Sequence, residues 1–370
     1  MDPLFPRPSP SGCRRGINPR RRCRGTTLPE LLVSFVISLI ILAGIVQVYS
    51  LSKSAYNTQS ALSEIQNTAR FAFELLGYQF RMVGYLGCGQ NRSLSLDNLL
   101  VNSGGSLVGD NFPYDFENVL WGYDKDSNAL PAPHVGFGSR VASDWVSFKM
   151  PANNGVVLVS GMGDATDTSF TVRPLGSDEI DPGKSIIISD CQRLRVVRSA
   201  TYGSGTPNST LTRAANPSDI GYVFGQGSNI YPIQTVAYYV DVDPTDGPRL
   251  MRKVHDDTAS PYTAAQALFD GVEHFEILYG VDTNPATNTP EQADIYVDAT
   301  EVAASHSFDD VVSVRVGMIV RSKEPVGAEN PTPIALFKGA GTYEISVAIP
   351  DDKRLRKSFE MSFSLRNRIL

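Results

Sequence analysis

The segments RGTTLPE, residues 24–30, and LLVSFVISLIILAGIVQVY, residues 31–49, decide the architecture of this chain. The second segment has 19 residues without a charge, which is long enough to cross a bilayer as one helix. It is too long for the apolar core of a secretory signal, and no small-x-small cleavage site follows it. We therefore expect a transmembrane helix over about residues 31–49 that is retained in the mature chain.

The alternative interpretation of this apolar run is a simple single-pass membrane anchor. Two residues beside the run argue against it. Gly25 lies just before the apolar stretch, and Glu30 lies at its start. A carboxylate at membrane depth costs a few kcal/mol unless it is paired. Cleavage after Gly25 would create a new amine on Thr26, which Glu30 of a neighbouring subunit can neutralise. The dipole at the start of the helix adds a smaller favourable term.

The charges of the chain are unevenly distributed. Residues 1–25 contain seven Arg and one acid, a net charge of +6, whereas the whole chain carries −6. Residues 26–370 therefore carry −12. A basic segment before an apolar run favours a cytoplasmic N-terminus under the positive-inside rule. A nucleic-acid-binding arm is the less favoured alternative, and the acidic body predicts no nucleic-acid binding because that would need a basic patch.

An amphipathic pattern continues beyond the apolar run. Apolar residues recur at spacings of three, four or seven from Leu51 to Val83, and no Pro occurs between Leu31 and Val83. This pattern predicts one helix from about Pro29 to Val83, roughly 80 Å long at 1.5 Å per residue. Two helices with a break near 50–54 are the alternative.

The body is predicted to be rich in strands. Turn clusters such as residues 243–248 and 284–290 separate short strand-like runs, so we expect an α+β protein with a leader (1–25), a helix (26–84) and a β-rich head (85–370). Segments 204–218 and 293–307 are expected to be loops, 264–269 a short helical turn, and a second β subdomain could begin near residue 207. The predicted strands cover 144–150, 155–159, 169–172, 185–189, 194–197, 235–242, 275–279, 310–321, 343–349 and 359–365.

The N-terminal segment resembles the type IV prepilin signature, in which a basic leader and Gly precede a short stretch that ends in Glu. The resemblance implies that a prepilin peptidase cleaves between Gly25 and Thr26 and methylates Thr26, and that Glu30 guides subunit docking. The first mature residue is usually Phe in this family, whereas here it is Thr26, and Pro29 before Glu30 is a second departure. Pro is acceptable in a first helical turn.

Several blocks of the body resemble the PilW family of type IV pilus minor pilins. They are residues 63–88, 189–193, 271–282, 311–322 and 363–368. The resemblance implies a minor pilin that primes pilus assembly and lies at or near the tip, with the major pilin and other minor pilins as partners. It also implies residence in the inner membrane with a periplasmic head, followed by incorporation into the fibre.

Four cysteines divide between leader and body. Cys13 and Cys23 lie in the leader, so the mature chain keeps Cys88 and Cys191, an even number suited to one bridge in an oxidising compartment. The family resemblance implies that these two form a disulfide that tethers the helix end to the sheet. Two unrelated buried thiols are the alternative.

The sequence contains no motif that indicates catalysis or a cofactor. It has no GxSxG, Walker A, GxGxxG, HExxH or CxxC pattern. The acids Asp241, Asp243 and Asp246 fit an EF-hand register poorly and favour a polar hairpin tip. We therefore expect a protein that is not an enzyme, with no catalytic residue, metal or cofactor.

Two other functions share these features. A J-type pseudopilin of a type II secretion system has the same signature and long helix, and the gene neighbourhood would separate the two. A tip adhesin or ligand-binding module is the other alternative, with specificity in long loops such as residues 86–118.

Overall fold

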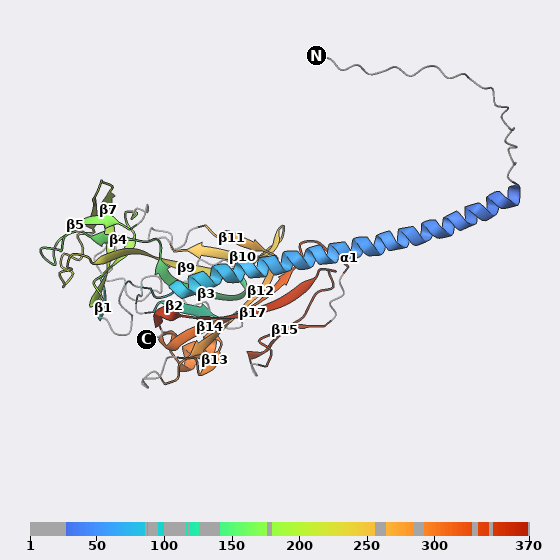
Figure 1. Cartoon of the computed structure of the whole chain (residues 1–370). Coiled ribbons are helices and arrows are strands. Elements are labelled where there is room, and N and C mark those ends of the chain that lie inside the picture. Colours follow the sequence, from blue (N-terminus) through green and yellow to red (C-terminus); the bar gives the residue numbers. More distant parts are fainter. Residues whose placement is uncertain are drawn as a thin grey trace, which may run out of the picture. The chain divides into compact units, whose positions relative to one another are not determined.

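The computed structural model describes residues 27–85, 87, 95–99, 116, 118–125, 141–175, 180–255, 264–284, 292–327, 332–339 and 343–368. The chain divides into two compact units, Met1–Ala55 and Tyr56–Leu370. The observed architecture is a long N-terminal helix and a β-rich head, as the sequence predicts (Figure 1).

Helix α1 runs without interruption from Leu28 to Met82. This confirms the single predicted helix and excludes a break near residues 50–54. Pro29 lies in the first turn, where its missing N–H removes no intrahelical hydrogen bond. Gly84 follows the helix with a φ of +69°, the left-handed conformation that commonly ends helices, and its N–H donates to the carbonyl of Lys149 (3.1 Å).

A sheet of 11 strands forms the larger part of the head. Its hub is β9 (Asn229–Asp243), which pairs with four other strands of this sheet. The others are β1 (Ser95–Asn98), β2 (Leu120–Tyr123), β3 (Val141–Pro151), β4 (Val156–Leu158), β5 (Ser169–Pro174), β6 (Ser185–Ser189), β7 (Arg193–Gly203), β8 (Ser209–Arg213), β10 (Gly247–Val254) and β11 (Gln266–Asp270).

A second sheet has the order β13-β12-β14-β17 and is antiparallel. A two-stranded hairpin packs against it, because Leu336 and Phe337 form a buried cluster with Leu278 and Ile319. The bounds are β12 (Val272–Val281), β13 (Ile295–Val297), β14 (Val311–Arg321), β17 (Arg356–Ser364), and β15 (Ile334–Leu336) with β16 (Ile345–Val347) in the hairpin. Helix α2 spans Ala299–Ser305, and short 3-10 turns cover Phe308–Asp310 and Arg366–Arg368.

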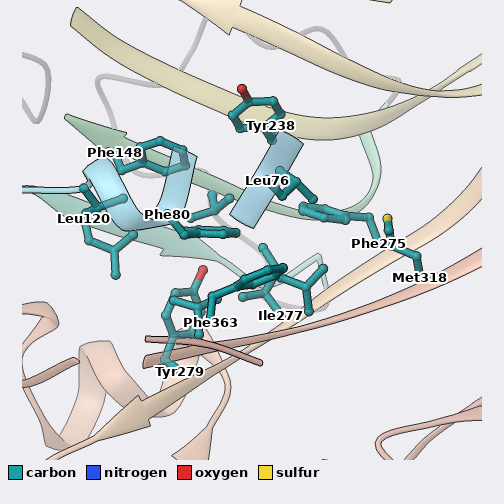
Figure 2. Close-up of a cluster of buried hydrophobic side chains, with 14 of the residues drawn as sticks. Leu76, Phe80, Leu120, Phe148, Tyr238, Phe275, Ile277, Tyr279, Met318 and Phe363 are labelled. Carbon is teal, nitrogen blue, oxygen red and sulfur yellow. The ribbon is translucent and has the colours of Figure 1, made fainter. Parts of the chain in front are cut away.

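The main core lies where the C-terminal part of α1 meets both sheets (Figure 2). The ring of Phe80 lies 5.3 Å from that of Phe148 on β3 and 5.4 Å from that of Phe363 on β17. Gly77 permits this close approach, since a Cβ there would come within 2.8 Å of the Phe363 ring. The helix is thus buried along the predicted face from Ile65 to Phe80, whereas Leu51 of the same predicted face is exposed.

A second cluster of buried residues lies around β4–β8 and the N-terminal half of β9. Arg213 is buried beside it and donates hydrogen bonds to five backbone carbonyls, those of residues 166, 167, 214, 217 and 218. Burial lowers the pKa of this guanidinium, which Asp219 and Asp167 partly oppose. Since β9 runs through both regions and residues 56–370 form one compact unit, the prediction of a separate subdomain from about residue 207 is wrong.

Three local predictions are also wrong. Segment 204–218 contains strand β8, the helical turn over 264–269 is strand β11, and segment 293–307 contains β13 and α2. Strand β8 alternates buried and exposed residues, but one of its buried positions is Arg213, so the apolar pattern of a strand is missing. Strand β11 is largely exposed, and β10 is its only strand partner among the described residues. For β8 and β11, tertiary strand pairing therefore outweighs the local sequence signal.

Candidate assembly and processing site

The start of α1 carries the predicted assembly residue. The carbonyl of Thr27 accepts hydrogen bonds from the N–H groups of Glu30 (3.0 Å) and Leu31 (3.2 Å), which close the first helical turn. Glu30 lies in this turn and is exposed. Its carboxylate has no hydrogen-bond or ion-pair partner among the described residues. A negative charge here interacts favourably with the helix dipole.

Gly25 and Thr26 lie outside the described residues, so the cleavage between them and the methylation of Thr26 remain predictions. Thr27, the next residue, is described and precedes α1 directly.

The apolar part of α1 is the second component of the site. The segment that follows Glu30 is apolar and long enough to cross a membrane, and none of it is buried within the chain. The hydroxyls of Ser34 and Ser38 donate to the carbonyls four residues earlier, at 2.8 and 2.7 Å. These bonds satisfy two polar groups on an otherwise apolar surface. Such a surface needs lipid or other apolar helices around it.

The turn that carries Cys191 is held by Asp190. The Oδ1 atom of Asp190 accepts hydrogen bonds from the N–H groups of Gln192 (3.0 Å) and Arg193 (2.9 Å), and Oδ2 accepts one from the hydroxyl of Tyr222 (2.7 Å). Partial burial works to raise the pKa of Asp190, but these donors lower it overall. Cys191 has a φ of +70°, an uncommon conformation for a residue with a side chain. The hydrogen bonds to Asp190 therefore fix the backbone conformation of the turn around Cys191.

Cys191 is disulfide-bonded, whereas Cys88 lies outside the described residues, so their pairing remains a prediction. The neighbouring Gly87 supports it. A Cβ at Gly87 would come within 3.1 Å of Ser189, two residues before Cys191. Nearby, the rings of Tyr85 and Tyr231 pack edge to face. The chain on both sides of the predicted bridge is therefore close in space.

We expect the processed chain to contain no free thiol. Denaturation without reductant followed by thiol titration should find none, and reduction should release two. The bridge would close a loop of about 100 residues, nominally worth about 4–5 kcal/mol in the chain-entropy model. Cys88→Ser and Cys191→Ser should therefore lower stability equally, and free thiols at both positions in the unmodified chain would contradict the prediction.

Sequence reasoning missed a buried charged cluster that joins the two sheets. The carboxylate of Asp144 on β3 accepts hydrogen bonds from the N–H groups of Ile277 (2.9 Å) and Lys125 (3.2 Å). The Nζ atom of Lys125 lies 2.5 Å from Oε1 of Glu276 on β12. Burial and the charge of Glu276 raise the pKa of Asp144 well above its usual range. The cluster connects strands β3 and β12. No local motif indicates it, because Asp144 and Glu276 are distant in sequence.

The aspartates of the β9–β10 turn form a hairpin tip, as favoured from the sequence. Asp243 pairs with Gly247 in the ladder, and Oδ1 of Asp243 accepts from the N–H groups of Thr245 (2.8 Å) and Asp246 (3.2 Å). Arg249 lies 3.1 Å from Asp246. Within the described parts of the chain, no group of three or more His, Cys, Asp or Glu residues could hold a metal ion.

Comparisons with known proteins identify two regions of the chain. The family described as Type IV Pilus-assembly protein W matches residues 237–367, and the prokaryotic N-terminal methylation motif matches residues 20–46. Both predicted resemblances are thereby confirmed. The first match includes the blocks at 271–282, 311–322 and 363–367, whereas those at 63–88 and 189–193 lie outside it.

Comparisons with whole proteins and with solved structures find little similarity. No curated protein matches the chain. A solved type IV-like pilin from Thermus thermophilus is 15% identical, with 51% of this chain and 86% of that chain covered and a TM-score of 0.21.

Proposed function

The chain is a type IV pilin-like protein with a PilW domain and an N-terminal methylation motif, and from this premise we propose that it is a minor pilin. It enters the inner membrane with a cytoplasmic N-terminus and a periplasmic head. A prepilin peptidase cuts between Gly25 and Thr26 and methylates Thr26. The mature chain then joins other minor pilins and the major pilin, primes assembly, and lies at or near the pilus tip. Its role is structural, not catalytic.

One observation carries this proposal. An exposed apolar helix begins with an exposed carboxylate, Glu30, that has no partner among the described residues of its own chain. Lipid can cover the apolar surface before assembly, and apolar helices of other subunits can cover it afterwards. Assembly supplies a partner for Glu30, because the amine created on Thr26 of a neighbouring subunit carries the complementary charge.

Mass spectrometry of the mature N-terminus tests the processing step. The full-length chain, produced with its own prepilin peptidase and extracted from membranes, should begin at Thr26 and carry one added methyl group. Gly25→Val is the matched control, since a branched side chain at the cut should leave residues 1–25 attached. An unmodified chain that keeps residues 1–25 would contradict the proposal.

Loss of the gene distinguishes a pilus function from a secretion function. The minor-pilin proposal requires that deletion reduces the number of surface pili while type II secretion continues. The PilW match over residues 237–367 supports the pilus, although the helix and its signature are common to both systems. Normal piliation together with a secretion defect would favour the J-type pseudopilin.

A further inference from the structure

Strand β17 presents a long unpaired edge. It pairs with β14 through nine residue pairs, from Ser313↔Ser364 to Arg321↔Arg356, without a register shift. It ends the sheet order β13-β12-β14-β17, and no described strand pairs with its other edge. Proteins usually shorten, bulge or cover such edges because their free N–H and C=O groups can pair with another chain. The edge strand β13, by contrast, has only three residues.

An apolar groove runs along this strand beside α1. Its volume is about 530 Å³. Figure 1 shows β17 lying alongside the helix. The apolar lining comes from Ala69, Phe73 and Gly77 of α1 and from Phe359, Met361 and Phe363 of β17. Met361 is 44% exposed, although the alternation of a strand places it on the same face as the buried Phe363. The groove therefore leaves apolar surface uncovered next to unpaired backbone.

Four charged residues line the groove, namely Arg70, Glu74, Arg81 and Glu360. Arg70 and Arg81 line it from α1 and have no ion-pair partner among the described residues. The acid Glu360 is already occupied, since it pairs with Arg315 (2.8 Å) and accepts a hydrogen bond from the N–H of Phe337 (2.7 Å). This leaves Glu74 as the one unpaired acid among the groove-lining residues. Two unpaired arginines therefore face one unpaired glutamate along the groove, although the body as a whole is acidic.

We propose that the free edge of β17 and this groove bind an extended acidic segment of another pilus subunit by strand addition. This inference rests on the proposed function, because it supplies the surface through which the head contacts its partner. The unpaired backbone of β17 requires an extended segment, the groove requires apolar side chains at alternate positions, and the unpaired Arg70 and Arg81 favour acidic residues.

Site-specific photocrosslinking of the full-length chain in its own membranes tests the inference. A benzoylphenylalanine at Met361 should crosslink to an extended, acidic segment of a second protein that carries the N-terminal methylation motif, as identified by peptide mass spectrometry. The matched control is the same substitution at Leu175, which follows β5 and is 48% exposed. It should give no such crosslink. A crosslink from Met361 to a second copy of this chain, or to an apolar helix of a partner, would overturn the inference.

Charge and edge substitutions give a quantitative test. Met361→Lys places a charge on the apolar floor and should lower co-purification of the crosslinked subunit by about tenfold or more, whereas Leu175→Lys should not. Arg70→Glu combined with Arg81→Glu should lower it as well, and raised salt should weaken binding by the unmodified chain. Unchanged thermal unfolding of each variant shows that the head remains folded. Full co-purification by folded Met361→Lys would overturn the inference.

Failure of the inference is distinguishable from failure of the proposed function. If Glu30→Ala abolishes piliation while Met361→Lys leaves it normal, the minor-pilin function stands and strand addition at β17 is wrong. If neither substitution affects piliation, both are wrong.

Discussion

Replacement of Glu30 by alanine is expected to lower incorporation of this chain into pili by about tenfold or more. An unpaired charge at membrane depth costs a few kcal/mol, and each 1.4 kcal/mol is a tenfold change in an equilibrium constant. The loss arises on the partner's side, because removal of Glu30 leaves the amine of a neighbouring Thr26 without a counter-charge in an apolar environment. Immunodetection of the chain in sheared pilus fractions, relative to the membrane fraction, measures the effect.

Two controls identify the charge of Glu30 as the cause. Glu30→Gln keeps the size of the side chain and should fail as badly as alanine, whereas Glu64→Gln, on an exposed position of the same helix, should incorporate normally. Cleavage between Gly25 and Thr26 should continue in all three variants. Incorporation of Glu30→Gln at the level of the unmodified chain would show that charge pairing does not drive docking.

Replacement of Arg356 by methionine is expected to destabilise the head by about 3–5 kcal/mol. The side chain of Arg356 is fully buried at the start of β17. Its guanidinium donates to Glu273 at 2.6 and 3.1 Å and to Asp352 at 2.7 and 2.7 Å. Methionine fills much of the volume but leaves two largely shielded carboxylates without their main donor. Denaturant unfolding of the full-length chain in detergent, followed by tryptophan fluorescence, measures the change.

A matched control separates the effect of burying an ion pair from the effect of removing a charge. Lys353 pairs with Asp351 at 2.9 Å, but both side chains are exposed. Lys353→Met should therefore cost less than about 1 kcal/mol. A cost for Arg356→Met as small as that for Lys353→Met would mean that the buried network contributes little to the fold.

The same network predicts how stability depends on pH. Hydrogen bonds from Arg356 are the main reason that the pKa of Asp352 falls to about 2, although partial burial opposes them. Unfolding returns this pKa to about 3.9. The unfolded state thus binds more protons between these values, so the contribution of Asp352 is present above about pH 4 and is lost as the pH falls toward 2. Arg356→Met should remove most of this acid sensitivity.

Much of the helix and of the candidate assembly site could be predicted because the information is local. The absence of Pro from Leu31 to Val83 and the periodic apolar residues specify one continuous helix, whatever it packs against. Likewise, a Gly and a Glu at fixed positions before an apolar run match the prepilin signature, and that resemblance predicts the assembly site. The hairpin between β9 and β10 is local in the same sense, since Asp243 bonds the backbone of its own turn.

The elements that were missed depend on distant partners. Strand β8 buries Arg213 instead of an apolar residue, because the carbonyls of the distant Thr166 and Asp167 and three carbonyls of the segment after β8 converge on its guanidinium. The groove beside β17 likewise requires Gly77 of α1 and Phe363 of β17 to meet, although they are far apart in the sequence. Neither arrangement leaves a periodic pattern that sequence analysis can detect.

The sequence by itself determined that this chain has a long helix, half of it suited to a membrane, with Gly25, Thr26 and Glu30 at its start. These features follow from composition and spacing over a few turns of one helix. Only the tertiary structure decided which charges are buried, how Arg356 and Asp144 join separate elements, and that no described strand covers the outer edge of β17 beside an apolar groove. Pairing between strands and the desolvation of charges are set by residues that fold together from distant positions, so no short segment encodes them.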